Sequence, residues 1–353
     1  MPYNLGMTQI TLALPYALPP PELAPDLLRA LDAPALSMLL SRCSSPRHSA
    51  YSPANRVLPH EAWLAAALHL TPAAAAPLAG AAMRGCDLAS APGHWFILQP
   101  AHVQLSRTHL LLADPRQLHL AEAEGRALFE LARPYFEETG KTLVYGSADL
   151  WFVRADDWAG LDTASPDAAM AQNLSDWVPE GAAARDYHKL QNEIQMLWHE
   201  HPVNQDRQAR GLTPVNSFWM WAGAAGDAPL AAQGATLAIA GGPAWMTVLA
   251  APELRAPELA QLLAAATRTG AASAMLAELI PSAVAGDWAD WLARMHRIEQ
   301  EWCAPLLAAL QSGRLASVTL LLSHRSASIE ATTTKLALRK FWRKPTLNLL
   351  KQA

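Results

Sequence analysis

The sequence predicts an α/β fold in which a mainly parallel sheet is flanked by helices. Apolar runs of strand length recur along the chain, and the segments between them carry apolar residues at helical spacing. Hydrophobic residues make up 51% of the 353 residues and charged residues 16%, which is typical of a well-buried globular protein. Residues 94–156 read as two strands, a helix and a hairpin, which indicates an α+β subdomain inserted into the core.

The strands of the core are expected where short apolar runs end at turn residues, at 8–14, 215–222, 235–242, 246–251 and 317–323. The run at 215–222 is apolar on both faces except at Asn216 and Ser217, so we expect it at the centre of the sheet. Helices are expected at 25–31, 34–43, 60–70, 76–86, 119–140, 184–200, 257–270 and 284–310.

The domain organisation follows from this order of elements. We expect an N-terminal strand and Ala-rich helices of the core over 1–90 and the inserted α+β subdomain over 91–160. Residues 161–353 are expected to complete the α/β core and to end in a basic tail. Residues 42–59 lack periodicity and are expected to form a loop.

Charge and cysteine content restrict the partners and the compartment. The net charge of −4 and the pI near 6.3 give no global reason to bind nucleic acid or anionic membranes. The three cysteines are scattered, which indicates reduced thiols. The N-terminal apolar run has no basic region before it and is interrupted by prolines, so we expect neither a signal peptide nor a membrane span. We therefore expect a cytoplasmic protein without membrane contact, and nucleic acid is not an expected partner.

The most distinctive stretch is HPVNQDRQARGLTPVNSFWMWAG at 201–223. Asn204 is expected to cap a short helix over 205–210, and Gly211 stands where a helix-ending glycine belongs. A guanidinium beside a helix N-terminus suits an anion, so Arg207 and Arg210 are candidate ligands of a small phosphorylated or carboxylate molecule. The edge of this site would be completed by Asn204 and Asn216. Alternatively, the arginines pin the loop by pairing with nearby carboxylates (Asp186, Glu193 or Asp206).

The C-terminal tail is the candidate interface with a protein partner. Arg339, Phe341, Trp342 and Arg343 lie in a run that also carries Lys335, Lys340 and Lys344. Arginine and tryptophan are enriched in interface hot spots. Alternatively, the tail is a solvated basic face whose aromatic rings dock on the core.

No catalytic residue and no metal ligand stand out from the residues themselves. His199, His201 and Asp206 lie close in sequence, but two histidines that straddle a helix end seldom converge on one ion. Ser217 has no evident base to activate it. We therefore expect no cofactor on this reasoning alone.

The stretch at 201–223 resembles a motif of the archaeal-type cofactor-independent phosphoglycerate mutases, members of the alkaline phosphatase superfamily. The likeness is specific over this stretch and loose over the rest of residues 92–325. The PVNS-x-W run and the FWRKP ending are more similar to proteobacterial RpfE-type regulators, which are also described as phosphoglycerate-mutase-like. The resemblance implies an alkaline phosphatase-like core in a degenerate form.

The departures from that family bear on function. The resemblance implies two metal ions and a Ser or Thr nucleophile, but the first strand reads ITLALPYALPP, without the family's Asp-Gly. The segment before the helix at 284–310 has no histidine, and Ser323-His324-Arg325-Ser326 retains a histidine without the family's Asp and Pro. The resemblance thus implies a non-catalytic protein with a regulatory or ligand-sensing role.

The alternative is an active phosphomutase or phosphatase that depends on Mn²⁺ or Zn²⁺. Its substrate would be phosphoglycerate or a similar small phosphate ester. Its metal ligands would then come from positions that do not align with the family, such as Asp87, Asp114, His324 and the loop at 42–59.

Overall fold

The computed structural model describes residues 8–72, 75–89, 91–106, 109–226 and 236–351. The chain divides into two compact units. Unit 1 contains Met1–Asn55, Ala232–Gly242 and Ala250–Ala353, and unit 2 contains Arg56–Ala231 and Pro243–Leu249. This division does not follow the expected boundaries at 90 and 160. Helices α3 (Pro59–Ala67) and α4 (Ala79–Gly85) and strand β8 (Ser217–Ala225) group in unit 2 with the segment that we expected to be an insert.

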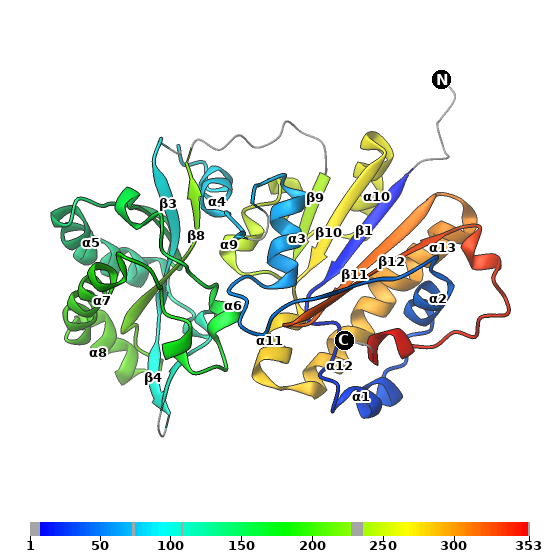
Figure 1. The fold of residues 1–353 in the computed structure, drawn as a ribbon, viewed down its shortest axis with the longest axis horizontal. Coiled ribbons are helices and arrows are strands. Elements are labelled where there is room, and N and C mark those ends of the chain that lie inside the picture. Colours follow the sequence, from blue (N-terminus) through cyan, green and yellow to red (C-terminus); the bar gives the residue numbers. More distant parts are fainter. Residues whose placement is uncertain (1–7, 73–74, 90, 107–108, 227–235, 352–353) are drawn as a thin grey trace. The chain divides into compact units, whose positions relative to one another are not determined.

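Unit 1 is built on a six-stranded sheet with the order β2-β12-β11-β1-β10-β9 (Figure 1). Its strands are β1 (Gln9–Leu14), β2 (Arg47–Ala50), β9 (Thr236–Ala240), β10 (Ala271–Leu276), β11 (Ser317–Ser323) and β12 (Ala327–Thr334). Strand β1 lies parallel between β10 and β11, and β9 is parallel to β10. Strands β12 and β2 add an antiparallel edge. The predicted α/β fold with a mainly parallel sheet is confirmed.

Helices flank this sheet, as expected from the amphipathic segments. They are α1 (Ala24–Ala30), α2 (Pro34–Arg42), α10 (Leu259–Thr269), α11 (Leu279–Ala285), α12 (Trp288–Ile298) and α13 (Ala304–Ser312). Helix α10 contacts β10, α2 contacts β12 and α13 contacts β11. The apolar stripe of α12, Trp291, Met295 and Ile298, is buried, and the indole of Trp291 donates a hydrogen bond to the Tyr16 carbonyl at 2.9 Å.

Three local predictions for these segments were wrong. Strand β2 occupies part of the expected loop at 42–59, and its four exposed residues carry no apolar alternation that would reveal an edge strand. Strand β10 was not predicted, because AASAML has few β-branched residues. No strand forms at the expected 246–251. Helix α9 (Ala244–Thr247), which belongs to unit 2, includes the first residues of this segment.

Unit 2 is built on an antiparallel sheet with the order β6-β7-β3-β8. The strands are β3 (His94–Ala101), β6 (Thr142–Ser147), β7 (Leu150–Arg154) and β8 (Ser217–Ala225), and β4 (Val103–Ser106) pairs with β5 (His109–Leu112) beside them. The helices are α3 (Pro59–Ala67), α4 (Ala79–Gly85), α5 (Glu122–Glu138), α6 (Pro166–Ala169), α7 (Ala184–His199), α8 (Pro202–Ala209) and α9.

The position of β8 corrects the prediction of a central strand in the parallel sheet. It is the outermost strand of this antiparallel sheet and pairs with β3. Both α4 and α7 contact it. Burial by helices therefore explains why both faces of β8 are apolar. The apolar residues of β8 do not indicate which strand pairs with it.

Aromatic packing forms the core of unit 2. The α5 ring Phe129 meets Trp151 of β7 edge-on at 5.3 Å between centroids, and Trp151 meets Trp198 of α7 at 5.9 Å. Such edge-to-face contacts stabilise pairs of buried rings beyond their area alone. The indole of Trp198 also donates to the Leu128 carbonyl at 3.2 Å, so helices α5 and α7 are joined by both apolar and polar contacts.

No helix in the described ranges combines the length and the apolar character needed to cross a bilayer.

We predict that Gly125→Ala destabilises unit 2 although alanine is the better helix former by about 1 kcal/mol. A Cβ at position 125 in α5 would lie 2.6 Å from both Cα and the carbonyl oxygen of Ala148 in the β6–β7 turn. Backbone atoms cannot move aside as a flexible side chain can, and overpacking costs about 1–3 kcal/mol. Urea unfolding should therefore show a lower midpoint. Gly160→Ala is the control, since a Cβ there meets nothing within 4 Å. An unchanged or raised midpoint for Gly125→Ala would contradict the close approach.

Candidate functional site

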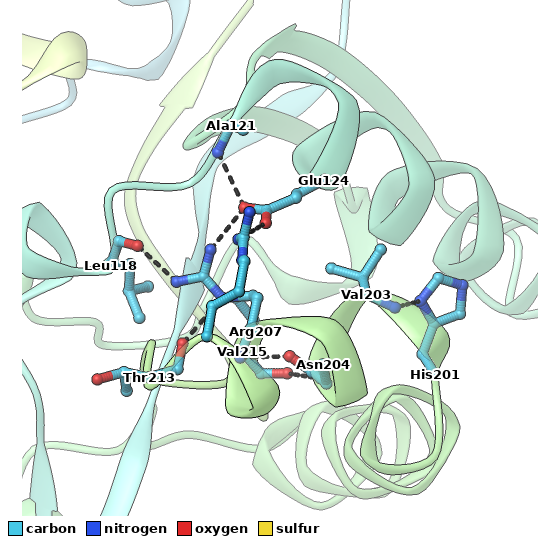
Figure 2. Close-up of polar contacts among 10 residues, drawn as sticks. Leu118, Ala121, Glu124, His201, Val203, Asn204, Arg207, Thr213 and Val215 are labelled. Carbon is cyan, nitrogen blue, oxygen red and sulfur yellow. Dashed lines mark hydrogen bonds and ion pairs between the residues drawn. The ribbon is translucent and has the colours of Figure 1, made fainter.

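The stretch at 201–223 is organised around the buried guanidinium of Arg207 on α8 (Figure 2). Its Nε donates to the Thr213 carbonyl at 2.9 Å, and Nη2 donates to the Leu118 carbonyl at 2.5 Å. Its Nη1 donates to Oε2 of Glu124 at 2.5 Å. The side chain has 0% exposure. All three nitrogens of Arg207 are thus engaged by atoms of unit 2.

Glu124 is the shared acceptor of this network. It accepts from the Ala121 N–H at the start of α5 at 3.1 Å and from Nη2 of Arg210 at 2.5 Å. Burial alone would raise the pKa of Glu124, but the Ala121 hydrogen bond and the two arginines together lower it below its ordinary value. The stability from a lowered carboxyl pKa is present above the unfolded pKa and is lost as the pH falls through the folded pKa. The sequence interpretation named the wrong carboxylates, because Glu124 is 83 residues distant along the chain.

The two asparagines of the repeated Pro-Val-Asn triplet serve the backbone. Asn204 is buried inside α8, where its amide donates to the Trp198 and Val215 carbonyls at 2.8 and 2.7 Å and accepts from the Val215 N–H at 2.8 Å. Asn216 forms a similar pair of 2.8 Å hydrogen bonds with the N–H and the carbonyl of Val103. Each side-chain amide therefore supplies backbone N–H and carbonyl groups with the hydrogen bonds that a neighbouring strand or helix turn would otherwise provide.

The expected cap of the short helix was wrong. The helix begins earlier than expected, and His201 is its N-cap, with Nδ1 accepting from the Val203 N–H at 3.2 Å. Pro202 at the first helical position fixes the backbone for this start. Gly211 follows the helix at a positive φ of 72°, as a helix-ending glycine does.

These contacts favour the structural interpretation of the stretch over the anion-binding one. An anion at Arg207 would have to enter a buried site and displace Glu124, and Asn204 has its amide occupied. Arg210 is different, because its side chain is 56% exposed. Anion binding by this stretch remains a prediction, and it depends on the exposed Arg210.

The carboxyl edge of the parallel strands in unit 1 is a second candidate site, because ligands collect at this edge in open α/β sheets. The chain leaves β1 at Pro15 and Tyr16, β10 at Ala277 and Glu278, and β11 at His324. Glu278 is paired with Arg297 at 3.6 Å, and the rings of His324 and Tyr16 meet edge-on at 6.2 Å. Among the residues that the structure describes, this edge brings no three metal-ligating side chains together.

Unit 2 contains a cluster that the sequence interpretation missed. His60 and Glu61 in the first turn of α3 and Asp167 in α6 each offer a ligand atom, and these atoms lie within 4.8 Å of one another. All three side chains are buried, at 1%, 0% and 4% exposure. Oε2 of Glu61 accepts from the Leu58 N–H at 2.8 Å, which fixes the carboxylate at the helix N-terminus.

Arg116 joins the cluster from the segment after β5. Its Nη2 lies 3.0 Å from Oδ1 of Asp167, and its Nε donates to Oδ1 of Asp114 at 2.7 Å. Burial and, to a lesser extent, the Arg116 charge lower the pKa of His60 to about 3, so the imidazole is neutral. A neutral imidazole with two carboxylates is a set of donors that binds transition metals.

The signals for this cluster are faint in the sequence. A His-Glu pair directly after Pro59 stands at a helix start, and Asp167 follows Ser165-Pro166, where Ser165 caps α6 by accepting from the Ala168 N–H at 3.1 Å. Both signals predict helix starts, and nothing in the spacing of 106 positions between Glu61 and Asp167 predicts that the two meet. Of the alternative ligands proposed from the sequence, Asp114 lies beside this cluster in unit 2, and Asp87 is exposed.

The tail of unit 1 presents its aromatic residues to solvent. Phe341 is 82% and Trp342 67% exposed, and their rings meet edge-on at 5.3 Å. Two of the basic side chains hold the segment: Arg343 and Lys340 donate to the Cys43 carbonyl at 2.9 and 3.2 Å, just past α2. Arg339 is exposed. The alternative in which the aromatic rings dock on the core is therefore wrong.

No family model matches this chain. A segment of 56 residues, 16% of the chain, is 36% identical to the 2,3-bisphosphoglycerate-independent phosphoglycerate mutase of Methanothrix thermoacetophila, and it spans only 14% of that enzyme. The PH0037 protein from Pyrococcus horikoshii has a similar structure, with a TM-score of 0.55 and 8% identity over 93% of this chain and 88% of that one.

A further solved structure is the cofactor-independent phosphoglycerate mutase from Thermoplasma acidophilum, with a TM-score of 0.47 and 12% identity over 98% of this chain and 95% of that one. The similarity to the Pyrococcus protein shows a shared fold. The short sequence match shows similarity to part of one phosphoglycerate mutase over that segment alone.

We predict that Arg207→Lys lowers the free energy of unfolding by about 2–3 kcal/mol, because a single ammonium cannot satisfy the Glu124 carboxylate and both carbonyls in the planar geometry of a guanidinium. Arg210→Lys is the matched control, since Arg210 shares Glu124 but is largely exposed. Its effect should stay within about 0.5 kcal/mol. Equal losses for the two variants in urea unfolding would contradict a structural role specific to Arg207.

Proposed function

We propose that this chain is a phosphoglycerate-mutase-like protein with a regulatory or ligand-sensing role, as in the RpfE-type regulators, and that it does not perform two-metal phosphotransfer. The observation that carries the proposal is the chemistry at the carboxyl edge of the parallel strands. Two-metal catalysis requires several carboxylates and imidazoles around a pair of ions about 3.5–4 Å apart. Strand β1 leaves this edge through apolar Leu14 and Pro15, which offer no such ligand.

The groups that do lie at this edge support the same conclusion. Glu278 is half-buried beside Arg297, and burial raises its pKa. Burial and then the Arg325 charge lower the pKa of His324. A carboxyl and an imidazole can act in acid–base chemistry, but two-metal phosphoryl transfer also needs enough ligands to hold two ions.

The 36% identity to a phosphoglycerate mutase over 56 residues supports a common origin with that enzyme. Relatives on one fold often differ in function, because function depends on the site. A regulatory role also needs a partner or a ligand. The exposed Phe341 and Trp342, held in place through Lys340 and Arg343, support a protein partner at the tail.

The second candidate is a metal-dependent phosphomutase or phosphatase acting on phosphoglycerate or a similar small phosphate ester. The buried cluster of His60, Glu61 and Asp167 favours it to the extent that the chain offers ligands for Mn²⁺ or Zn²⁺. A catalytic ion needs an open coordination position and room for its substrate. The cavity beside Asp167 has a volume of about 20 Å³, which is room for about one water molecule.

We predict that the full chain neither interconverts 3- and 2-phosphoglycerate nor hydrolyses them, with Mn²⁺ or Zn²⁺ supplied. A coupled assay for mutase activity and a free-phosphate assay for hydrolysis test this directly. An active cofactor-independent phosphoglycerate mutase prepared in parallel is the positive control. Turnover that disappears with a chelator and returns with metal would overturn the regulatory proposal and establish the second candidate.

A further inference from the structure

We infer that His60, Glu61 and Asp167 together bind one divalent transition-metal ion, with Zn²⁺ preferred over Mn²⁺ and Mg²⁺. The inference goes beyond the proposed function and does not depend on it, since a bound ion is compatible with a regulatory protein and with an enzyme. It replaces the expectation from the sequence that the chain has no metal ligand.

The geometry of the three side chains is close to that of a metal site. Their ligand atoms lie within 4.8 Å of one another. Zinc bonds of about 2.0–2.2 Å in a tetrahedral arrangement place ligand atoms about 3.4 Å apart. Closing the site therefore needs atomic shifts of about 1 Å, which small rotations of the carboxylates and the imidazole provide. The backbone already holds all three residues in place, because His60 and Glu61 share the first turn of α3 and Asp167 lies in the capped helix α6.

The donor set selects the class of metal. Mg²⁺ and Ca²⁺ prefer sites made of oxygen atoms alone, whereas an imidazole nitrogen favours Zn²⁺ and other transition metals. Among divalent ions of the first row, affinity for such a site rises from Mn²⁺ towards Cu²⁺ and Zn²⁺. Glu61 and Asp167 add two carboxylate oxygens as ligands. Together with Asp114 they place three carboxylates near the single guanidinium of Arg116. The local charge therefore favours a cation.

A small cavity borders Asp167 and Arg116. Its volume is about 20 Å³, enough for about one water molecule. Asp167 and Arg116 form part of its wall, and Gln99 and Asp149 contribute further polar groups. Three protein ligands and one water complete the four positions that zinc usually takes. Of the three ligands only Asp167 lines this cavity, so a water in it would lie on the Asp167 side of the ion.

An ion at this place would join two segments of unit 2 that are distant in sequence. It would link the N-terminus of α3 to α6, and Arg116 would connect it to the segment after β5. Because binding then stabilises the folded state, Zn²⁺ raises the melting temperature of the protein.

The first experiment is a calorimetric titration of Zn²⁺ into the chelator-stripped full chain. We expect one ion per chain, weaker binding of Mn²⁺, and a rise in melting temperature with Zn²⁺. His60→Gln and Glu61→Gln should each weaken Zn²⁺ binding by more than about 100-fold, since each removes a ligand. Glu61→Gln retains an oxygen acceptor for the Leu58 N–H, so the helix cap is preserved. His109→Gln and Glu130→Gln are the matched controls in the same unit, because both residues are exposed.

X-ray absorption of the zinc-loaded wild-type chain keeps the inference testable even where a variant fails to fold. We expect one imidazole and otherwise oxygen ligands at about 2.0–2.2 Å. Sulfur in the first coordination shell would assign the ion to a cysteine and overturn the inference. So would the absence of stoichiometric Zn²⁺ binding, or wild-type affinity in both His60→Gln and Glu61→Gln.

The result is separable from the activity assay. Zinc binding without turnover supports both the metal site and the regulatory proposal. If the wild-type chain shows turnover and both His60→Gln and Glu61→Gln bind zinc with wild-type affinity, the regulatory proposal and the metal site are both contradicted. Absence of zinc binding together with absence of turnover overturns the metal site and leaves the regulatory proposal standing.

Discussion

A guanidinium buried away from water must find its hydrogen-bond acceptors inside the protein, and this requirement organises unit 2. The acceptors of Arg207 come from the segment before α5, from the first turn of α5 and from the loop before β8. Removing one partner of such a buried pair is costly because it leaves the other charge without compensation. The same contacts hold α8 against α5 and fix where β8 begins. Glu124 adds a helix cap to its two ion pairs, so one carboxylate determines the start of α5 and the place of α8.

This arrangement changes how the motif at 201–223 is understood. Its arginines and asparagines resemble a ligand-binding set when they are read along the chain, yet Arg207 and Asn204 satisfy buried backbone groups and Glu124. A motif that resembles one in a family of enzymes can therefore be retained because it holds the fold together. In this chain the polar residues of the motif support the fold of unit 2, while the carboxyl edge of the parallel sheet in unit 1 has apolar residues where β1 ends. The likeness of this motif to one in an enzyme family therefore does not by itself indicate catalysis.

The cluster of His60, Glu61 and Asp167 has the opposite character. Burying carboxylates is unfavourable unless they are paired, hydrogen-bonded or bound to a metal. Arg116 and the helix cap at Leu58 contribute to this compensation. A divalent ion would add to it by linking α3 to α6. Two networks of charged groups in unit 2 thus differ in character: one is centred on the Arg207 guanidinium, and the other has the donor set of a metal site.

The sequence by itself determined the class of fold and most of the elements. Apolar periodicity predicted β1, β8, β11 and the amphipathic helices α5, α7 and α12, because these residues face a core whichever elements form it. Periodicity does not reveal which strands are neighbours, and so β8 was expected in the parallel sheet although it pairs with β3. It also missed β2 and β10, whose residues carry little alternation or β-branching. Only the tertiary structure decided that Glu124 pairs with Arg207 and that Asp167 meets His60 and Glu61, because charge pairing and metal coordination depend on distances in space between residues that are far apart along the chain.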